Sequence, residues 1–255
     1  MNAVALPTCQ CQQPNAPLPS VAALQATVAR SSVRVLVISV HPDDEALGCA
    51  GTILRHRDRG DELHWLIVTQ AHPPRWPQAV IDRKAEEVSR AADLYGMKQV
   101  TKLGQPTTQL DQVPQGELIG QLAEHVAKVQ PEVIYTIHDG DVHTDHRVTF
   151  SALTSAVKPF NMQKLGVRRL LSFETLSSTD AAPQLVNRLF IPNVYHDITP
   201  YIDKKLAAMA IFDTEQQTPW QPRGDSAIRA LARYRGATMA VEYAEAFMLI
   251  RECQW

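Results

Sequence analysis

The chain has no run of apolar residues approaching the roughly 18 that a membrane-spanning helix needs, so no transmembrane segment is predicted. It also has no excess of positive charge, because its 25 Lys and Arg are balanced by 27 Asp and Glu among 255 residues. The broad basic field that holds a nucleic-acid backbone is missing, which excludes nucleic acid as an expected partner. The N-terminus lacks the basic region and apolar run of a secretion signal, so we expect a cytoplasmic protein.

Cysteine is scarce, and the four residues at positions 9, 11, 49 and 253 do not make a disulfide framework in a chain of this size. We expect reduced thiols. Cys9 and Cys11 lie in a segment rich in Pro, Gln and Asn, with no second Cys/His pair nearby to complete a metal site. We predict a flexible N-terminal tail over residues 1–20 and a single domain over residues 21–255.

From Val33 onward, short apolar runs alternate with amphipathic stretches. The runs VRVLVISV, ELHWLIVT and EVIYTI predict buried strands, and the stretches 79–95 and 116–129 predict helices. This order is typical of an α/β fold, and we predict a Rossmann-like, doubly wound, mainly parallel sheet with helices on both faces. After residue 160 the pattern is less regular, and the closing AEAFMLIRE fits a strand or a helix equally well.

The motif His41-Pro42-Asp43-Asp44-Glu45 directly follows the first predicted strand and precedes the first predicted helix. Ligands bind at this position in open α/β sheets, outside the carboxyl ends of the strands. Two adjacent carboxylates repel each other unless a cation or a helix N-terminus compensates them. A capped turn accounts for one aspartate but not for two acids beside an imidazole. The motif therefore indicates a metal site.

A second cluster, His143-Thr144-Asp145-His146, follows the strand EVIYTI and opens the next predicted helix, about a hundred residues after the first motif. The carboxyl ends of two parallel strands can converge on one crevice. The two clusters can then offer two imidazoles and a carboxylate to a single ion. The sequence thus predicts one divalent-metal centre built from both motifs.

The segment HPDDEALGCAGTI resembles the signature of the LmbE-like, or PIG-L, N-acetylglucosaminyl deacetylases, and HTDHRV resembles that family's second metal motif. The likeness extends over residues 33–251, including LLSFETLSST and the closing RGATMAVEYAEAFMLIR. The resemblance implies a hydrolase that removes the N-acetyl group from an N-acetylglucosamine-type amino sugar or glycoconjugate. It implies zinc as cofactor, although a site of two histidines and one aspartate also suits ferrous iron. The oligomeric state stays open.

The resemblance also implies roles for the residues of both motifs. The metal ligands are expected to be His41, Asp44 and His146, which leave positions open for water and for the substrate carbonyl. Asp43 is then the general base for a water whose pKa zinc lowers towards ~7. We expect His143, as imidazolium, to stabilise the oxyanion or protonate the leaving amine, with Asp145 orienting it.

Substrate contacts are expected from Arg83, Asp141 and Glu245, which lie in the family-like segments. Two of them also have simpler explanations, since Arg83 can form a surface ion pair with Glu86 and Glu245 can be an acid at a strand edge. Trp220, in the loop TPWQPRGD that also holds Arg223, could stack on a sugar face. Glu45 is expected to support the first motif rather than to bind the metal. In the resemblance, Thr107 stands where many relatives carry an acid. Of the other histidines, those at positions 56, 64 and 72 are expected to have no role in the site.

Two other functions fit parts of the pattern. His41, Asp43 and His146 match the two-histidine, one-carboxylate triad of non-haem iron oxygenases, but that class should have an all-β fold and would leave Asp44 unexplained. An inactive, metal-containing carbohydrate-binding module would not need Asp43 and His143. The amide hydrolase remains the main prediction.

Overall fold

The computed structural model describes residues 31–255, and residues 32–255 form one compact unit. The predicted tail over residues 1–20, with Cys9 and Cys11, lies outside the described residues, as does the beginning of the domain predicted over 21–255. Within the described part of the chain, no helix has the length and apolar character to cross a membrane.

Within residues 31–255, seven strands form one sheet in the order β3-β2-β1-β4-β5-β7-β6. The first five in this order are parallel, whereas β7 runs antiparallel to both β5 and β6. The mainly parallel sheet is therefore confirmed, and the closing AEAFMLIRE is a strand. The strands are β1 (Arg34–Ser39), β2 (Glu62–Gln70), β3 (Gln99–Pro106), β4 (Val133–Ile137), β5 (Arg169–Phe173), β6 (Val194–Asp197) and β7 (Ala244–Glu252).

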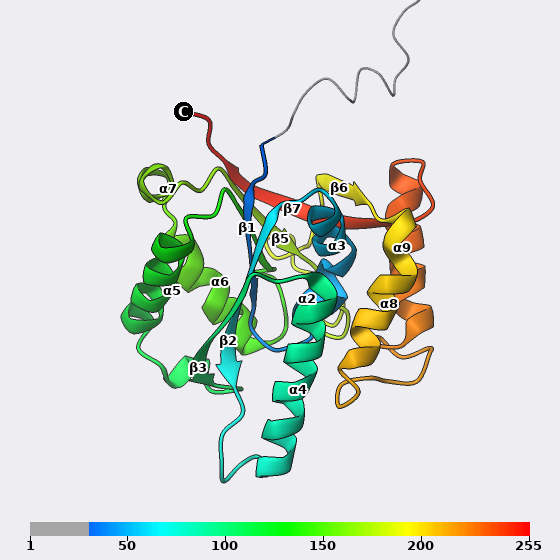
Figure 1. The fold of residues 1–255 in the computed structure, drawn as a ribbon, viewed down its shortest axis with the longest axis horizontal. Coiled ribbons are helices and arrows are strands. Elements are labelled where there is room, and N and C mark those ends of the chain that lie inside the picture. Colours follow the sequence, from blue (N-terminus) through cyan, green and yellow to red (C-terminus); the bar gives the residue numbers. More distant parts are fainter. Residues whose placement is uncertain (1–30) are drawn as a thin grey trace, which may run out of the picture. The chain divides into compact units, whose positions relative to one another are not determined.

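Helices cover both faces of the sheet, with α5 and α6 on one side and α2, α3, α4, α8 and α9 on the other (Figure 1). This confirms the predicted α/β architecture. The helices are α2 (Asp44–Gly48), α3 (Ala50–Asp58), α4 (Gln78–Tyr95), α5 (Gln115–Val129), α6 (Thr144–Ala156), α7 (Pro159–Leu165), α8 (Ile202–Ile211) and α9 (Asp225–Thr238). Helix α6 ends at Ala156, and Pro159 is the first residue of α7, where its missing N–H costs nothing.

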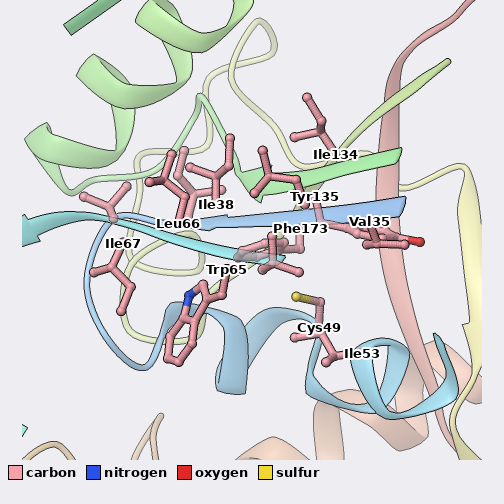
Figure 2. Close-up of a cluster of buried hydrophobic side chains, with 14 of the residues drawn as sticks. Val35, Ile38, Cys49, Ile53, Trp65, Leu66, Ile67, Ile134, Tyr135 and Phe173 are labelled. Atoms are coloured by element: carbon pink, nitrogen blue, oxygen red, sulfur yellow. The ribbon is translucent and has the colours of Figure 1, made fainter. Parts of the chain in front are cut away.

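The core lies on both faces of the central strands because these strands are apolar on both sides. Figure 2 shows Trp65 of β2 on the side of the helices that carry Cys49 and Ile53, whereas Leu66, the next residue, projects to the opposite side. All four side chains are fully buried. Burial on both faces explains why the strand runs are continuously hydrophobic rather than alternating.

The amphipathic stretch that begins at Ala46 forms two helices rather than one, because the backbone leaves the helical conformation at Cys49 (φ −146°). Gly48, just before the break, packs so closely on the Phe173 ring that a Cβ placed there would lie 2.0 Å from Cδ2. The strand β5 therefore approaches the end of α2 directly, and α3 starts again in a new direction.

The strand order reverses between β1 and β4, which are neighbours at the centre of the sheet. The chain continues from β1 towards β2 and β3 on one side, and from β4 towards β5 on the other. Such a switch point leaves a crevice outside the carboxyl ends of the two central strands. Both motifs lie at this crevice.

Candidate metal and active site

The two motifs come together at the switch point, as the sequence predicted. His41 and Asp44 follow β1, and His146 lies in the first turn of α6, which follows β4. The Nδ1 atom of His41 lies 3.2 Å from Nε2 of His146. The Asp44 carboxylate is beside both rings, with Oδ1 3.4 Å from His146 Nε2 and Oδ2 3.9 Å from His41 Nδ1. Two imidazole nitrogens and one carboxylate, from two distant segments, thus lie within 3.9 Å of one another.

The far side of each imidazole faces a carboxylate. His146 Nδ1 lies 2.9 Å from Oδ2 of Asp141, and His41 Nε2 lies 3.2 Å from Oδ2 of Asp145. When these nitrogens donate to the carboxylates, the lone pairs of His41 Nδ1 and His146 Nε2 point at each other. This carboxylate-histidine pairing is the usual second layer of a metal site, because it sets the tautomer and the ring orientation.

The spacing and the charge of these groups fit a divalent cation. Ligands about 2.1 Å from a tetrahedral ion lie ~3.4 Å from each other, close to the distances between the two imidazole nitrogens and the Asp44 carboxylate. Burial lowers the pKa of His146, but Asp44 and Asp141 outweigh it and raise that pKa to about 10. The same histidine holds the pKa of Asp44 below its usual range despite burial. The cluster therefore attracts positive charge, and His41, Asp44 and His146 could hold a metal.

His143 stands next to this cluster, with a ring nitrogen within 4.8 Å of those of His41 and His146, so it is a further potential ligand. Its Nδ1, however, accepts a hydrogen bond from the backbone N–H of Asp145 (3.2 Å), which caps α6. A neutral His143 then carries its proton on Nε2. Burial, followed by the neighbouring His41 and His146, lowers the pKa of His143 to about 4. A neutral donor is thus favoured over the imidazolium that we expected.

Asp145 has partners other than the one that we expected. Its carboxylate faces His41 and accepts hydrogen bonds from the backbone N–H groups of Thr108 (2.6 Å) and Leu110 (3.1 Å). The ring of His143 contacts the backbone of Asp145, not its side chain. Because Asp145 lies in the first turn of α6, its side chain turns towards the loop after β3 and the first motif.

Asp43 is held in a strained backbone conformation, with φ 125°, and is 4% exposed. A non-glycine residue at such an angle is rare and concentrates at functional sites. Burial, and then the charge of Asp44, raises the pKa of Asp43 well above its usual range, although Arg223 opposes this shift. Glu45 lies beneath the motif, where it is fully buried and accepts hydrogen bonds from Ser39 Oγ (3.1 Å) and the Asp43 N–H (3.3 Å).

Arg223, in the loop between α8 and α9, forms an ion pair with Asp43, with Nη1 3.2 Å from Oδ2. Within the described residues, no other residue of this loop forms an ion pair with Asp43. Glu215, in the same loop, pairs with both Arg223 and Lys84 of α4, each at 2.5 Å. We had noted Arg223 only as a neighbour of Trp220. Trp220 itself is 78% exposed and lies outside the cavity lining, so its expected stacking on a sugar stays a prediction.

A cavity of about 230 Å³ contains the motif residues and continues towards α4 and the end of β2. Among its lining residues, Trp76 and Thr107 come from loops that follow β2 and β3. We did not predict Trp76. The only sequence signal for it was its place after a strand's carboxyl end, where loops often carry function.

The three expected substrate contacts occupy different environments. Arg83 is exposed and pairs with Asp213, and the neighbouring Lys84, not Arg83, lines the cavity. Asp141 is buried, and its carboxylate is taken up by His146, Thr175 and the His143 N–H. A direct contact from Arg83 or Asp141 to substrate therefore stays a prediction.

Glu245 also has its carboxylate occupied within the protein. One oxygen accepts from the Gly51 N–H (2.9 Å) and the other from the Thr52 N–H (2.7 Å), at the start of α3. Lys205 Nζ lies 2.7 Å from Oε1 and donates as well to the carbonyls of Ala46 and Leu47, at the end of α2. Glu245 does not line the cavity over the motifs. It joins the two helices that follow the first motif.

Asp141→Ala is expected to weaken metal affinity by about 10- to 100-fold, because His146 loses the acceptor that orients its ring. Metal affinity can be measured by competition with a chromophoric chelator. The matched control is Asp139→Ala, an exposed aspartate of the same loop, which should bind metal like the unchanged protein. Equal affinities of both variants would mean that Asp141 does not support the site.

The known proteins that are similar to this chain include named deacetylases. Residues 36–157 match the family model described as PIG-L: GlcNAc-PI de-N-acetylase. A Bacillus anthracis protein named "Probable N-acetyl-alpha-D-glucosaminyl L-malate deacetylase 2" is 26% identical over 184 residues, which are 69% of this chain and 78% of that protein. The diacetylchitobiose deacetylase of Thermococcus kodakarensis is 25% identical over 233 residues, 85% of this chain and 83% of the relative.

A protein with a similar fold is named for a different reaction. One similar crystal structure is that of GalB, the 4-carboxy-2-hydroxymuconate hydratase of Pseudomonas putida KT2440. The superposition covers 88% of this chain and 98% of GalB, with a TM-score of 0.67 and 20% identity. Fold alone does not decide the chemistry. Both motifs lie within residues 36–157, which match the PIG-L family model, and the two relatives above are named as deacetylases, so this likeness bears on the chemistry more than the fold does.

Proposed function

We propose that this protein is a divalent-metal-dependent hydrolase that removes the N-acetyl group from an N-acetylglucosamine-type amino sugar or glycoconjugate. The observation that carries the proposal is the pair of imidazole nitrogens of His41 and His146, 3.2 Å apart, each with a carboxylate on its far side. Asp44 would complete the ligand set. The named deacetylase relatives support the substrate class.

The chain's own residues can carry the proton transfers of amide hydrolysis. A divalent cation supplies a Lewis acid for the amide carbonyl and lowers the pKa of water. Asp43, next to ligand Asp44, takes a proton from the attacking water and returns it to the amide nitrogen. A carbon–oxygen bond forms as the water adds to the carbonyl carbon, and the carbon–nitrogen bond then breaks, which yields acetate and a free amine. His143 Nε2–H donates to the carbonyl oxygen as negative charge develops there.

The alternatives explain fewer of these contacts. An iron oxygenase that uses His41, Asp43 and His146 would leave Asp44 between the two rings without a role, and its expected fold differs from this mainly parallel sheet. A binding module would have no need of Asp43 in a strained and buried position, since strain of this kind costs of order 1–3 kcal/mol. Zinc and ferrous iron both suit the donor set.

The test is acetate release from a panel of N-acetylglucosamine derivatives. Protein loaded with zinc or with ferrous iron should release acetate, and chelator-treated protein should lose at least 100-fold of that activity and regain it when metal is restored. The more active metal identifies the cofactor. A protein that binds one equivalent of metal yet releases acetate from no compound would contradict the proposed reaction.

A further inference from the structure

The cavity over the motifs continues into an apolar chamber, which we define by Leu47 of α2, Ile67 and Ala71 at the end of β2, Trp76, and Ile81 and Val88 of α4. Leu47, Ile67 and Val88 are at most 5% exposed, so they form its inner wall. In Figure 2, Ile67 lies at the carboxyl end of β2, beside the loop that follows β1. The chamber is therefore contiguous with the metal motifs.

Three of the charged residues that line the same cavity lie nearer to solvent than the inner wall of the chamber does. The side chains of Lys84, Glu215 and Arg223 are 19%, 29% and 25% exposed, in contrast to the inner wall of the chamber. Their network offers several hydrogen-bond donors and acceptors around Asp43. The cavity thus has a polar part towards solvent and an apolar part inside.

An amide at the metal motifs carries two substituents, one on each side of the reacting bond. In the proposed reaction, the nitrogen carries a sugar, whose hydroxyl groups would lose their hydrogen bonds against an apolar wall at considerable cost. The sugar therefore fits the polar part. The carbonyl carries the acyl group, which has only C–H groups to bury and fits the chamber.

An acetyl group needs little of this space. The polar part and the chamber share a cavity of about 230 Å³, whereas a cavity of ~150 Å³ is enough to hold one benzene molecule. A chamber built only for acetyl would be closed after one methyl group. Six apolar side chains from α2, the end of β2, the loop after it and α4 line this chamber, which is more than one methyl group can contact.

We propose that the chamber binds the acyl chain of the substrate and that the protein hydrolyses N-acyl amino sugars whose linear acyl chain is longer than acetyl. The inference rests on the proposed function and extends its substrate class. The reaction is balanced in the same way: water supplies the oxygen of the released carboxylate and the proton of the amine. No oxidant or further reactant is required.

The test compares kcat/KM for N-acetyl-, N-butanoyl-, N-hexanoyl- and N-octanoylglucosamine, measured as free amine released by the metal-loaded protein. Each methylene buried on binding should raise kcat/KM by about fourfold until the chamber is full. Butanoyl and hexanoyl compounds should therefore exceed the acetyl compound by tenfold or more.

Ala85 of α4 lines the cavity, and Ala85→Phe should reduce the hexanoyl-to-acetyl ratio of kcat/KM by at least fivefold. The matched control is Ala79→Phe, an exposed alanine on the same helix that does not line the cavity, which should keep the ratio of the unchanged protein. An unchanged ratio in Ala85→Phe would overturn the chamber assignment.

The remaining outcomes separate this inference from the proposed function. Activity that is highest with acetyl and falls steadily with chain length overturns the inference and leaves the deacetylase intact. A gain seen with octyl N-acetylglucosaminide, but not with longer acyl chains, also overturns it, because the chain would then sit on the sugar side. If no amide is cleaved, the proposed function fails. The chamber is then tested by calorimetry of hexanoate and acetate binding, and hexanoate that binds no more tightly than acetate overturns the chamber assignment.

Discussion

Replacing Asp43 with asparagine is expected to lower kcat for amide hydrolysis by about 10²- to 10⁴-fold, the range that a positioned general base contributes. Asparagine has nearly the same shape and, like aspartate, tolerates positive φ better than most residues, so the turn at φ 125° should persist. Its amide cannot take a proton from water. Arg223 keeps its second partner, Glu215, and is not left with an unpaired charge.

Metal content separates a chemical defect from a structural one. Asp43→Asn should bind one equivalent of metal, whereas His146→Ala should lose both metal and activity, because it removes a ligand. Asp180→Asn, an exposed aspartate, is the matched control and should behave like the unchanged protein. If Asp43→Asn retains kcat within tenfold, Asp43 is not the base and the proton transfers must be assigned elsewhere.

The sheet and the meeting of the two motifs could be predicted because both depend on local signals. Continuous apolar runs predicted the parallel strands, and each motif lay after such a run, the first directly and the second after residues 138–142. In a parallel sheet, position after a strand already fixes which edge a residue occupies. His41 and His146 then meet if β1 and β4 are neighbours in the sheet, as they are. The predicted convergence of the two motifs on one crevice assumed a strand order of this kind.

Features that depend on distant segments could not be read from local patterns. The break at Cys49 follows from Phe173 of β5, which packs on Gly48, and from Lys205 and Glu245, which satisfy the backbone groups on either side. Each of these partners lies more than 120 residues away in sequence. The stretch ALGCAGTILRHRDRG is a continuous helical pattern until those contacts are known.

For the same reason, neither the partners of Asp145 nor the place of Lys84 in the cavity lining could be predicted from the sequence. Sequence proximity suggested that Asp145 orients His143, but the first turn of a helix directs the two side chains to different neighbours. The face of α4 that lines the cavity carries Ile81, Lys84, Ala85 and Val88, and Arg83 lies outside this face. The packing of α4 decides which face this is.

The final prediction concerns Glu245, for which the structure gives a stabilising role. Glu245→Ala is expected to lower the free energy of unfolding by about 3–5 kcal/mol, because it leaves the buried Lys205 ammonium without its counter-charge. It also removes the acceptor of the Gly51 and Thr52 N–H groups. Urea denaturation with linear extrapolation measures the change.

Two further variants show whether the loss arises from the unpaired charge. Glu242→Ala removes one partner of an exposed ion pair with Arg233 close by in sequence, and it should cost under about 1 kcal/mol. Adding Lys205→Met to Glu245→Ala should recover part of the lost stability, since the uncompensated buried charge is gone. If Glu245→Ala unfolds within 1 kcal/mol of the unchanged protein, its carboxylate does not hold α2 and α3 together, and a role towards substrate becomes the better explanation of this residue.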